Sequence, residues 1–366
     1  MPLQLRVKKT EGKPGKVYYP LELKEVPEPT PGPGQVLVRL LAAALNHRDH
    51  FIRQHLYPAI SFDAPMLADG CGVVAALGGP DPSPRARSLL GRREPARFAV
   101  TGSSLLCEDA GCAAEYAVVS EAELEAAPEH LSPAQAAALP VVGLTAWRAL
   151  VTKAGISPAG NGNGNGEGGG KGPRKNVLVT GIGGGVALTA LQLAVAMGCR
   201  VFVTSGDPAK IARAVAELGA EAGVNYKEAD WDAQLAALLP ADRPSLDAII
   251  DGAGGDVVKR SLRLLRPGGV ISSYGMTVSP RMDWLMPAVL KQIELRGTTM
   301  GSRAEFADMV AFVRERRIVP VVSRAVRGLD NLDGIEGLFD DLKAGRQFGK
   351  LVIEIADGSD KSPPRL

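Results

Sequence analysis

The 366-residue chain carries 42 basic and 40 acidic residues, for a formal net charge of +2, and 45% of its residues are hydrophobic. A chain of this length has room for two domains and buries a large core, so folding requires no disulfide bond or structural metal. The near-neutral charge gives no electrostatic reason to expect a nucleic-acid or anionic-membrane partner. No apolar run reaches the length of about 18 residues that a membrane span needs.

The four cysteines are spaced too irregularly to predict a disulfide framework or a C-x-x-C redox pair. Cysteines in this pattern favour a reducing compartment. Residues 1–16, MPLQLRVKKTEGKPGK, contain no apolar core of the kind found in secretory signals. These observations predict a cytoplasmic protein.

Short β-strands separated by proline- and glycine-rich turns are predicted for the first 120 residues. The strand-like segments are 34–45 (GQVLVRLLAAAL), 70–78 (GCGVVAALG) and 115–124 (EYAVVSEAEL). Near residue 132 the composition becomes helical, with Ser132 as a candidate N-cap and Pro133 at the first helical position. The segment 159–172 (AGNGNGNGEGGGKG) cannot bury apolar surface and predicts a flexible insertion.

After this insertion, strand-like segments alternate with helix-like segments as far as about residue 318. The strand-like segments are 176–181, 199–205, 222–226, 246–254 and 268–275. Strands that alternate with helices at this spacing predict a parallel, doubly wound sheet. The chain ends on a further strand, FGKLVIEI (348–355). We therefore predict an α/β protein that combines a Rossmann-type doubly wound parallel sheet with a β-rich part.

A glycine cluster, GIGGG (181–185), follows directly after the strand NVLVT and directly before the helix VALTALQLA. Glycines in this setting allow a tight turn and let the backbone approach a pyrophosphate at the helix N-terminus. Gly183, Gly184, Gly185 and Val186 are the candidate contacts. The cluster departs from a regular G-x-G-x-x-G pattern, and a purely structural turn is the alternative interpretation.

The second strand of the alternating region ends in Thr204 and Ser205, with no acidic residue at its end. An NAD site usually places an acid there to bind the ribose 2′-hydroxyl. Small hydroxyls together with Lys210 instead suit a 2′-phosphate, which favours NADPH over NADH. Asp207 leaves NADH possible, although the favoured interpretation of Asp207 is an N-cap for the helix that begins at Pro208.

Taken together, these segments resemble the zinc-independent quinone oxidoreductase group of the medium-chain dehydrogenases/reductases. The resemblance depends on ALNHRDHFIRQHLYP (44–58), PMLADGCGVV (65–74), LPVVGLTAWRAL (139–150), NVLVTGIGGGVALTALQLA (176–194), LGAEAGVNY (218–226), DAIIDGAGG (247–255), LLRPGGVISSYG (264–275) and FGKLVI (348–353). It covers nearly the whole chain apart from the glycine-rich insertion. No single motif decides it, but their order along the chain does.

The resemblance implies a GroES-like substrate domain formed by residues 1–140 and 318–366. It implies a Rossmann dinucleotide-binding domain over 141–317, with the active site in a cleft between the two domains. Members of the group often form homodimers by joining their Rossmann sheets edge to edge. The segments 268–275 and 294–302 are the candidates for that edge.

Three of the four histidines, His47, His50 and His55, fall within NHRDHFIRQH (46–55), which raises the possibility of a metal site. Zinc-dependent relatives carry Cys at the position of Asn46 and a His-Glu pair at the position of Ala68 and Asp69, so the resemblance implies no catalytic zinc. Their structural zinc needs four cysteines, and here only Cys107 and Cys112 lie close together. No carboxylate or thiol completes a set with the three histidines, so no metal is expected. One of them is left as a candidate substrate ligand or proton donor.

Without a Lewis acid, a carbonyl must be polarised by hydrogen bonds and the hydride placed by proximity. These conditions suit hydride transfer to an α,β-unsaturated carbonyl or to a quinone. The candidate catalytic residues are Asn46, Tyr57, Asp49 and Asp69. Asn46 is the strongest candidate because its amide is a hydrogen-bond donor. Tyr57 is equally well explained as a packed loop aromatic, and the two acids as ion-pair partners of Arg48 or Arg53.

The resemblance assigns the remaining candidates to the cofactor. Thr145 matches a residue beside the nicotinamide, and Lys350 matches a basic position near the pyrophosphate. The adenosine-phosphate contacts are Ser205, Lys210 and Tyr226, and those at the nicotinamide end are Ala253, Tyr274, Gly275 and Met276.

The sequence therefore predicts an NADPH-dependent, zinc-free oxidoreductase with a small-molecule substrate. A tailoring reductase of a secondary-metabolite pathway, with a bulky substrate, is an alternative within the same fold. A non-catalytic NADPH-binding protein is an alternative from another class. A methyltransferase also has a glycine loop after a strand, but the N-terminal β-rich part and the LTAW segment disfavour it.

Overall fold

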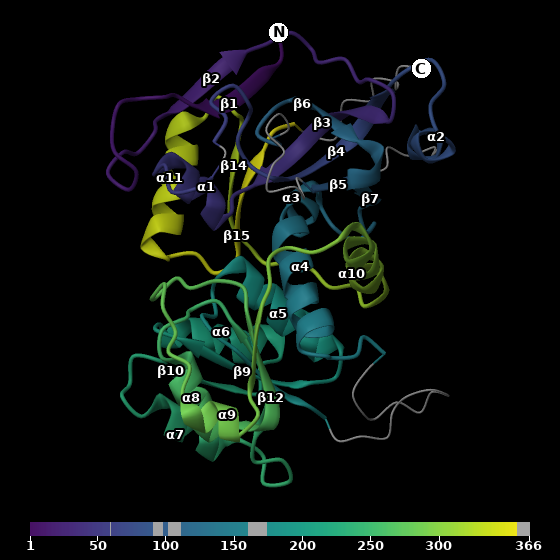
Figure 1. Ribbon diagram of the computed structural model, residues 1–366. Helices are drawn as coiled ribbons and strands as arrows, with labels where there is room; N and C mark the ends of the chain where they lie inside the picture. Colours follow the sequence, from purple (N-terminus) through teal and green to yellow (C-terminus); the bar gives the residue numbers. More distant parts are fainter. Residues whose placement is uncertain (59, 91–97, 102–110, 160–173, 357–366) are drawn as a thin grey trace. The chain divides into compact units, whose positions relative to one another are not determined.

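The computed structural model describes residues 1–58, 60–90, 98–101, 111–159 and 174–356 (Figure 1). The chain divides into two compact units, Met1–Val141 with Ser302–Leu366 and Val142–Gly301. All but the first residue of the predicted insertion 159–172, and also Cys107, lie outside the described residues. Among the residues described, no helix is long and apolar enough to cross a membrane.

The first unit is built on a seven-stranded, mostly antiparallel sheet and a separate ribbon of two strands. Its strands are β1 (Leu3–Val7), β2 (Leu21–Glu25), β3 (Gln35–Ala44), β4 (Asp69–Leu77), β5 (Phe98–Thr101), β6 (Tyr116–Ser120), β7 (Leu124–Ala126), β14 (Val322–Arg327) and β15 (Lys350–Glu354). Its helices are α1 (His47–Arg53), α2 (Pro84–Leu90), α3 (Pro133–Ala137), α10 (Arg303–Glu315) and α11 (Leu332–Ala344), with a 3₁₀ turn at Glu121–Glu123. The order in the large sheet is β14-β15-β3-β4-β5-β7, and β6 also pairs with β3.

Strand β3 occupies the middle of this sheet because it is apolar along nearly its whole length. All but two of its residues are buried. A strand that is covered on both faces has a continuous apolar sequence, whereas a half-exposed strand alternates. The last three residues of β3, Ala42, Ala43 and Ala44, are each 0% exposed. Their small side chains let the neighbouring elements pack closely around this end of the strand. The end of β3 is therefore a fixed point in the unit.

The second unit contains a six-stranded parallel sheet of order β10-β9-β8-β11-β12-β13. Its strands are β8 (Asn176–Val179), β9 (Arg200–Ser205), β10 (Ala222–Asn225), β11 (Leu246–Asp251), β12 (Leu265–Ser273) and β13 (Glu294–Gly297). Its helices are α5 (Gly185–Ala196), α6 (Pro208–Leu218), α7 (Trp231–Leu238), α8 (Val257–Leu264) and α9 (Met286–Leu290); α4 (Pro140–Trp147) begins at the boundary and continues as a π-helix at Arg148–Lys153. The predicted doubly wound parallel sheet is confirmed.

The strand order of the second unit reverses between β8 and β11, because the chain runs outward from β8 through β9 to β10 and then returns to β11. Ligands of open α/β sheets bind at such a reversal, beyond the carboxyl ends of the strands. The glycine cluster lies at this end of β8, and Asp251 is the last residue of β11. The topology therefore identifies the carboxyl ends of β8 and β11 as the expected ligand-binding position.

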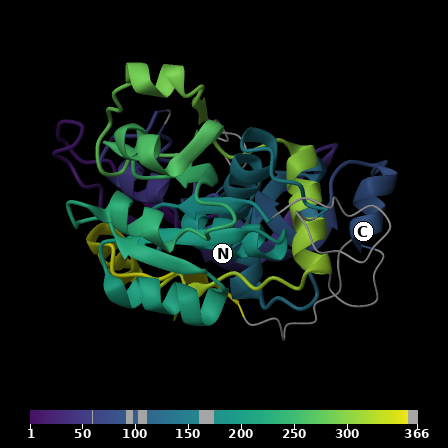
Figure 2. The same ribbon diagram turned by 90° about the horizontal axis from the view of Figure 1, so that it is seen from below.

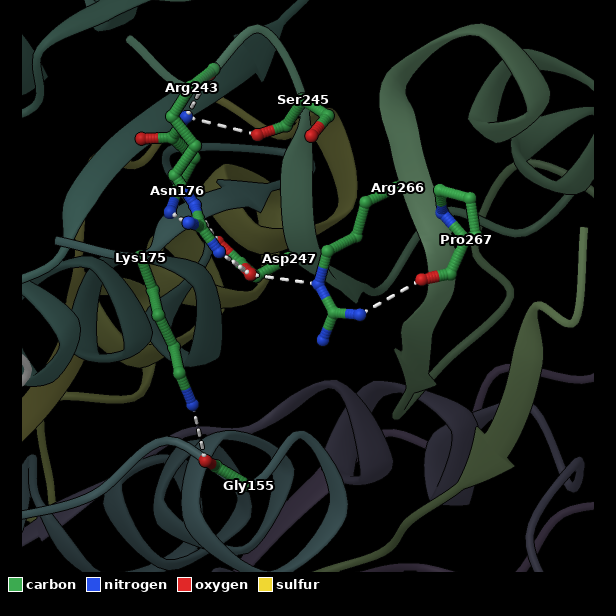
Figure 3. Close-up of polar contacts among 8 residues, drawn as sticks. All are labelled: Gly155, Lys175, Asn176, Arg243, Ser245, Asp247, Arg266 and Pro267. Carbon is green, nitrogen blue, oxygen red and sulfur yellow. Dashed lines mark hydrogen bonds and ion pairs between the residues drawn. The ribbon is translucent and has the colours of Figure 1, made fainter. Parts of the chain in front are cut away.

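At the other end of this sheet, where the strands begin, a buried carboxylate links three strands (Figure 3). Asp247 accepts hydrogen bonds from the Asn176 backbone N–H (3.0 Å), from Arg243 Nε (2.8 Å) and from Arg266 Nε (3.0 Å). Burial alone would raise the pKa of this carboxyl, but the bonds from Arg243, Asn176 and Arg266 outweigh it and leave the pKa lowered. Because these residues begin or precede β8, β11 and β12, the cluster fixes the amino ends of three strands.

Helix α10 belongs to the first unit, although the sequence placed residues 303–317 in the Rossmann domain. Arg314 Nη2 donates to the Ala126 carbonyl of β7 (2.6 Å), and the His130 ring bonds the Ile318 carbonyl (3.0 Å). Figure 1 shows the yellow-green α10 near β7, which it contacts, and Figure 2 shows the same helix from below. The second boundary therefore lies at residue 302 rather than 318, because α10 buries its apolar face against the β-rich part of the chain.

Candidate active site

Three polar side chains from three neighbouring strands meet at one end of the first unit's sheet. Asn46 follows β3, Asp69 begins β4 and Lys350 begins β15. The register pairs Ala44 with Asp69 on one side and with Val352 on the other. Because β15 and β4 flank β3, the first residue of each lies next to the point where β3 ends.

These side chains form a closed triangle of hydrogen bonds. Lys350 Nζ donates to Asn46 Oδ1 (2.7 Å) and to Asp69 Oδ2 (2.9 Å), and Asn46 Nδ2 donates to the same Asp69 oxygen (2.9 Å). Exposure is 8% for Asn46, 0% for Asp69 and 5% for Lys350. The other oxygen of Asp69 accepts from the Val141 backbone N–H (2.9 Å). Only one of the two amide hydrogens on Asn46 is used by the triangle.

Asp49 lies directly behind Asn46, in the first turn of α1. Its Oδ2 accepts a 2.7 Å hydrogen bond from the Asn46 backbone N–H, and its Oδ1 is buried without a hydrogen-bond partner among the described residues. Burial raises the pKa of Asp49 to about 6, against the opposing effects of Arg48, the Asn46 N–H and Lys350. Asp49 is thus a buried carboxyl group whose protonated form is favoured more than in an exposed aspartate.

Arg53 anchors the helix that carries Asp49. Its guanidinium is bidentate to Glu336 of α11 (2.7 and 2.6 Å), and its Nε donates to the Tyr19 carbonyl (2.8 Å). Arg53 is 2% exposed. Figure 1 shows α1 beside α11, which are joined by this ion pair. The suggestion that Arg53 pairs with Asp49 or Asp69 is therefore wrong, since Glu336 takes the guanidinium and Lys350 pairs with Asp69.

Two of the three histidines near Asn46 have different tyrosine partners. His50 lies 3.4 Å from the Tyr18 hydroxyl, and His55 hydrogen-bonds the Tyr19 hydroxyl. His47 keeps solvent contact, yet its low-dielectric surroundings lower its pKa, and the charges of His50 and Lys350 lower it further. Within the described ranges, no three His, Cys, Asp or Glu side chains are grouped as a metal site would require.

Tyr57 lies outside the triangle. The guanidinium of Arg48 sits over its ring, 5.1 Å from the centroid. This contact matches the packed-aromatic interpretation. Any catalytic role of Tyr57 stays a prediction.

In the second unit, the glycine cluster is fastened to the end of β9. The Gly181 N–H donates to Thr204 Oγ1 (3.3 Å), and Ser205 Oγ donates to the Ile182 carbonyl (3.3 Å). Gly181 and Gly183 have φ values of +67° and +121°, which only glycine adopts at little cost. Gly184 is extended and leads into α5, whose first turn contains Gly185 and Val186. The first backbone N–H groups of a helix have no partner inside the helix, so this turn offers donors to an anion.

The corner beyond β9 gathers two lysines and a tyrosine. The Lys210 side chain packs against Gly183 of the glycine cluster. A Cβ added to Gly183 would lie 2.8 Å from Lys210 Cδ and 3.2 Å from its Nζ. A Cβ on Gly206 would lie 2.6 Å from Lys227 Cε and 3.0 Å from the Tyr226 hydroxyl. Burial lowers the pKa of Lys210, with Asp207 opposing. Sequence reasoning missed Lys227, although it directly follows Tyr226.

Two predicted residues at this corner have defined structural roles. Asp207 caps α6 by accepting from the Ala209 N–H (2.9 Å), as the N-cap interpretation predicted. Ser205 is 4% exposed, and its hydroxyl also accepts from the Asp207 N–H (3.2 Å). Ser205 therefore joins the glycine cluster to the next turn, and its predicted contact with the cofactor stays a prediction.

The nicotinamide-end candidates follow the ends of β11 and β12. Asp251 is fully buried and accepts from Thr180 Oγ1 (2.8 Å), the Gly254 N–H (3.0 Å) and the Ala253 N–H (3.1 Å). Burial raises its pKa against the opposing effects of these bonds. The sequence prediction omitted both Asp251 and Thr180, although each stands at the carboxyl end of a predicted strand.

The other candidates at this end differ in exposure. Tyr274 packs against Gly252, where an added Cβ would lie 2.5 Å from its hydroxyl, and burial raises the pKa of Tyr274. Gly275 is half-buried and Met276 is exposed, while Thr145 lies on α4 with 6% exposure. Their contacts with a cofactor remain predictions.

Comparison with known proteins places this arrangement in a family. The description "Zinc-binding dehydrogenase" matches residues 185–315, and "Alcohol dehydrogenase GroES-like domain" matches residues 32–129. The chain is 50% identical to the zinc-type alcohol dehydrogenase-like protein YogA of Leptosphaeria maculans, over 97% of this chain and 100% of that one. It therefore belongs to the zinc-type alcohol dehydrogenase-like, medium-chain dehydrogenase/reductase family and is an oxidoreductase. The predicted combination of a GroES-like unit with a Rossmann unit is confirmed.

Two solved structures share this fold over 97% of the chain. An NAD-dependent alcohol dehydrogenase is 29% identical with a TM-score of 0.76, and all of that chain is covered. The quinone oxidoreductase from Coxiella burnetii is 26% identical with a TM-score of 0.72, and 99% of that chain is covered. The family thus contains both alcohol dehydrogenases and quinone oxidoreductases, and similarity alone does not choose between them.

The family name includes zinc, but the donor set at the triangle does not fit a zinc ion. A catalytic zinc takes three protein ligands from Cys, His and carboxylate side chains. Here Asn46 Oδ1 and Asp69 Oδ2 both accept from the Lys350 ammonium, which would repel a metal cation at the same atoms. Ala68 offers no side-chain donor. The triangle therefore lacks the ligand set that a catalytic zinc needs.

Proposed function

We propose that this protein is an NADPH-dependent, zinc-free reductase that transfers hydride to an α,β-unsaturated carbonyl compound or a quinone. The observation that carries the proposal is the Lys350–Asn46–Asp69 triangle. It provides a fixed positive charge and an oriented amide donor where zinc-dependent relatives have metal ligands. The second unit contributes the dinucleotide site, with its glycine cluster and helix N-terminus.

In the proposed reaction, bound NADPH would supply hydride to the β-carbon of the acceptor, and negative charge would collect on the carbonyl oxygen. The second N–H of Asn46, which the triangle does not use, donates to this oxygen and stabilises the enolate. The α-carbon then takes a proton from solvent, which completes the two-electron reduction. Asp69 and Asp49 hold Asn46 from its side chain and from its backbone.

The preference for NADPH is supported by the positive charge near the 2′-phosphate position. Lys210 and Lys227 lie close to the turn after β9, and Asp207 is committed to capping α6. An acid that caps a helix is a poor ribose ligand, because its oxygen already accepts a backbone N–H. NADH binding would instead require Asp207 to leave the cap.

The first experiment is a fluorescence titration of metal-stripped protein with NADPH and then with NADH. Tight binding of NADPH and weak binding of NADH would support the cofactor assignment, and the reverse order would overturn it. Turnover is then measured with 2-cyclohexenone, a 2-alkenal, 1,4-benzoquinone and a bulky chalcone. Turnover of chalcone alone would favour the tailoring-reductase alternative.

Binding without turnover of any acceptor would favour a non-catalytic NADPH-binding protein. Oxidation of simple alcohols with NAD, restored only by added zinc, would instead favour the alcohol dehydrogenase alternative that the solved relative suggests. Asn46→Ala separates these outcomes, because the proposal requires loss of turnover with cofactor affinity retained. Unchanged turnover in this variant would exclude Asn46 as the catalytic donor.

We also propose a homodimer formed through the open edge of the parallel sheet. Strand β13 is the last in the sheet order of the second unit. The neighbouring segment exposes apolar side chains, namely Val278, Trp284, Met286, Val289 and Leu290. Apolar groups at an open strand edge favour pairing with a second copy of the chain.

A further inference from the structure

We propose that Lys350 is a positioning residue that sets the orientation of the Asn46 amide. This inference rests on the proposed function, in which Asn46 is the donor to the carbonyl oxygen. The family resemblance predicted Lys350 as a contact near the cofactor pyrophosphate. In the structure its ammonium donates two of its three hydrogens, one to Asn46 and one to Asp69, both in the first unit.

An asparagine side chain has two orientations that differ by exchange of its oxygen and its NH₂ group, and the surrounding donors and acceptors decide between them. Here Oδ1 faces an ammonium and Nδ2 faces a carboxylate. The reversed orientation would place NH₂ against NH₃⁺ and oxygen against a carboxylate, so both contacts would become repulsive. Lys350 and Asp69 therefore act together to permit one orientation only.

The same contact strengthens the remaining donor of Asn46. An amide whose oxygen accepts a charged hydrogen bond is polarised, so its N–H becomes a better donor. The free N–H of Asn46 is thus fixed in direction and made more acidic by a charge that Lys350 supplies from the opposite side of the amide. Removing the charge should affect turnover and leave the dinucleotide site of the second unit intact.

The closing experiment compares the full-length Lys350→Met variant with the wild type. If Lys350 positions Asn46, the NADPH dissociation constant stays within about twofold, while kcat with the best acceptor falls about 100-fold, the usual effect of losing a transition-state donor. Lys259→Met, on the exposed face of α8, is the matched control and leaves both quantities unchanged. A large loss of NADPH affinity with kcat retained would assign Lys350 to the pyrophosphate and overturn the proposal.

Chemical rescue tests the requirement for a cation at this point. Adding ethylammonium to Lys350→Ala should restore part of kcat, whereas ethanol at the same concentration should not. A second variant, Lys350→Met with Asp69→Asn, removes the pair together and avoids leaving Asp69 as a buried unpaired charge. Its kcat should fall about as far as that of Lys350→Met, because Lys350 and Asp69 orient the Asn46 amide together. Additive losses would contradict this.

A readout that needs no activity keeps this inference separate from the proposed function. In asparagine-selective ¹⁵N NMR spectra of the wild type, the Asn46 side-chain amide should show slow hydrogen exchange and two well-separated proton shifts. Its signal is identified by its loss in Asn46→Ala. Rapid exchange in the wild type would refute the fixed orientation, whatever the enzyme reduces. A protected amide in a protein that reduces no acceptor would refute the proposed function alone.

Discussion

Thr180 directly precedes the glycine cluster, and its hydroxyl donates a 2.8 Å hydrogen bond to the Asp251 carboxylate at the end of β11. The same hydroxyl accepts from the Gly252 N–H (3.1 Å). The pair ties together the two strands between which the order of the parallel sheet reverses. Two loops that sequence reasoning treated separately, 181–185 and 252–254, are therefore held as one structure.

Replacing this hydroxyl should weaken dinucleotide binding. Thr180→Val removes a hydrogen bond to a charged group, which is worth about 1.5–3 kcal/mol, and part of that loss should appear as an NADPH dissociation constant raised about tenfold. Fluorescence titration measures the change. Ser261→Ala is the control, because Ser261 is a buried hydroxyl of the same unit that bonds within its own helix. Equal affinity in the wild type and Thr180→Val would show that the pair does not shape the site.

Cofactor discrimination should depend on the two lysines after β9. Lys227→Ala removes a charge beside Gly206 and should raise the NADPH dissociation constant about tenfold, since a charge-assisted bond to phosphate is lost. Its effect on NADH should stay within about twofold. Asp207→Ser keeps the N-cap of α6 and should leave the preference unchanged. A switch of Asp207→Ser toward NADPH would mean that Asp207 binds the ribose in the wild type.

Asp49 should make the protein less stable as the pH rises. Its folded pKa, about 6, lies above the ordinary value of 3.8, so the folded state binds the proton more tightly than the unfolded state. Stability should therefore fall as pH rises from about 4 to 6, by roughly 3 kcal/mol at most. Asp49→Asn removes this charge and should flatten the trend in urea denaturation at pH 4 and pH 7. A steeper trend in the variant would contradict the assignment.

Asp247 should act in the opposite sense. The pKa of Asp247 is lowered in the folded state. Its contribution to the stability of the fold is therefore complete above the unfolded pKa and is lost as the pH falls through the folded pKa. Asp247→Ala leaves Arg243 and Arg266 without their shared carboxylate and should cost about 3 kcal/mol at pH 7. Urea denaturation at pH 7 and pH 3 should show the difference shrinking in acid. Asp283→Ala, an exposed carboxyl of the same unit, is the control.

The proposed dimer predicts a concentration-dependent assembly that one surface change disrupts. Leu290 is 73% exposed at the end of α9, and Leu290→Asp places a charge in the apolar segment beside β13. Light scattering after size-exclusion chromatography should give about twice the chain mass for the wild type and the chain mass for the variant. A monomeric wild type at micromolar concentration would remove the proposal.

Much of the local structure was predictable because its causes lie close together in sequence. Strands alternating with helices predicted the parallel sheet, Ser132 caps α3, and Asp207 caps α6. The predicted boundary near residue 318 differs from the division of the structure at residue 302, because helical periodicity gives no information about which unit covers the apolar face of α10. The NHRDHFIRQH segment was similarly ambiguous, since His50 and His55 are close in sequence and have different tyrosine partners in the structure.

The sequence by itself determined the class of fold, the glycine cluster and the absence of zinc-type ligands at positions 46 and 68. Only the tertiary structure brought Lys350 to Asn46 and Asp69, which are 304 and 281 positions away along the chain. Such a contact depends on the register of β15 and β4 against β3. Register is set by which side chains of each strand must face the core and by the connections between the strands, so the sequence near the three residues does not by itself give it.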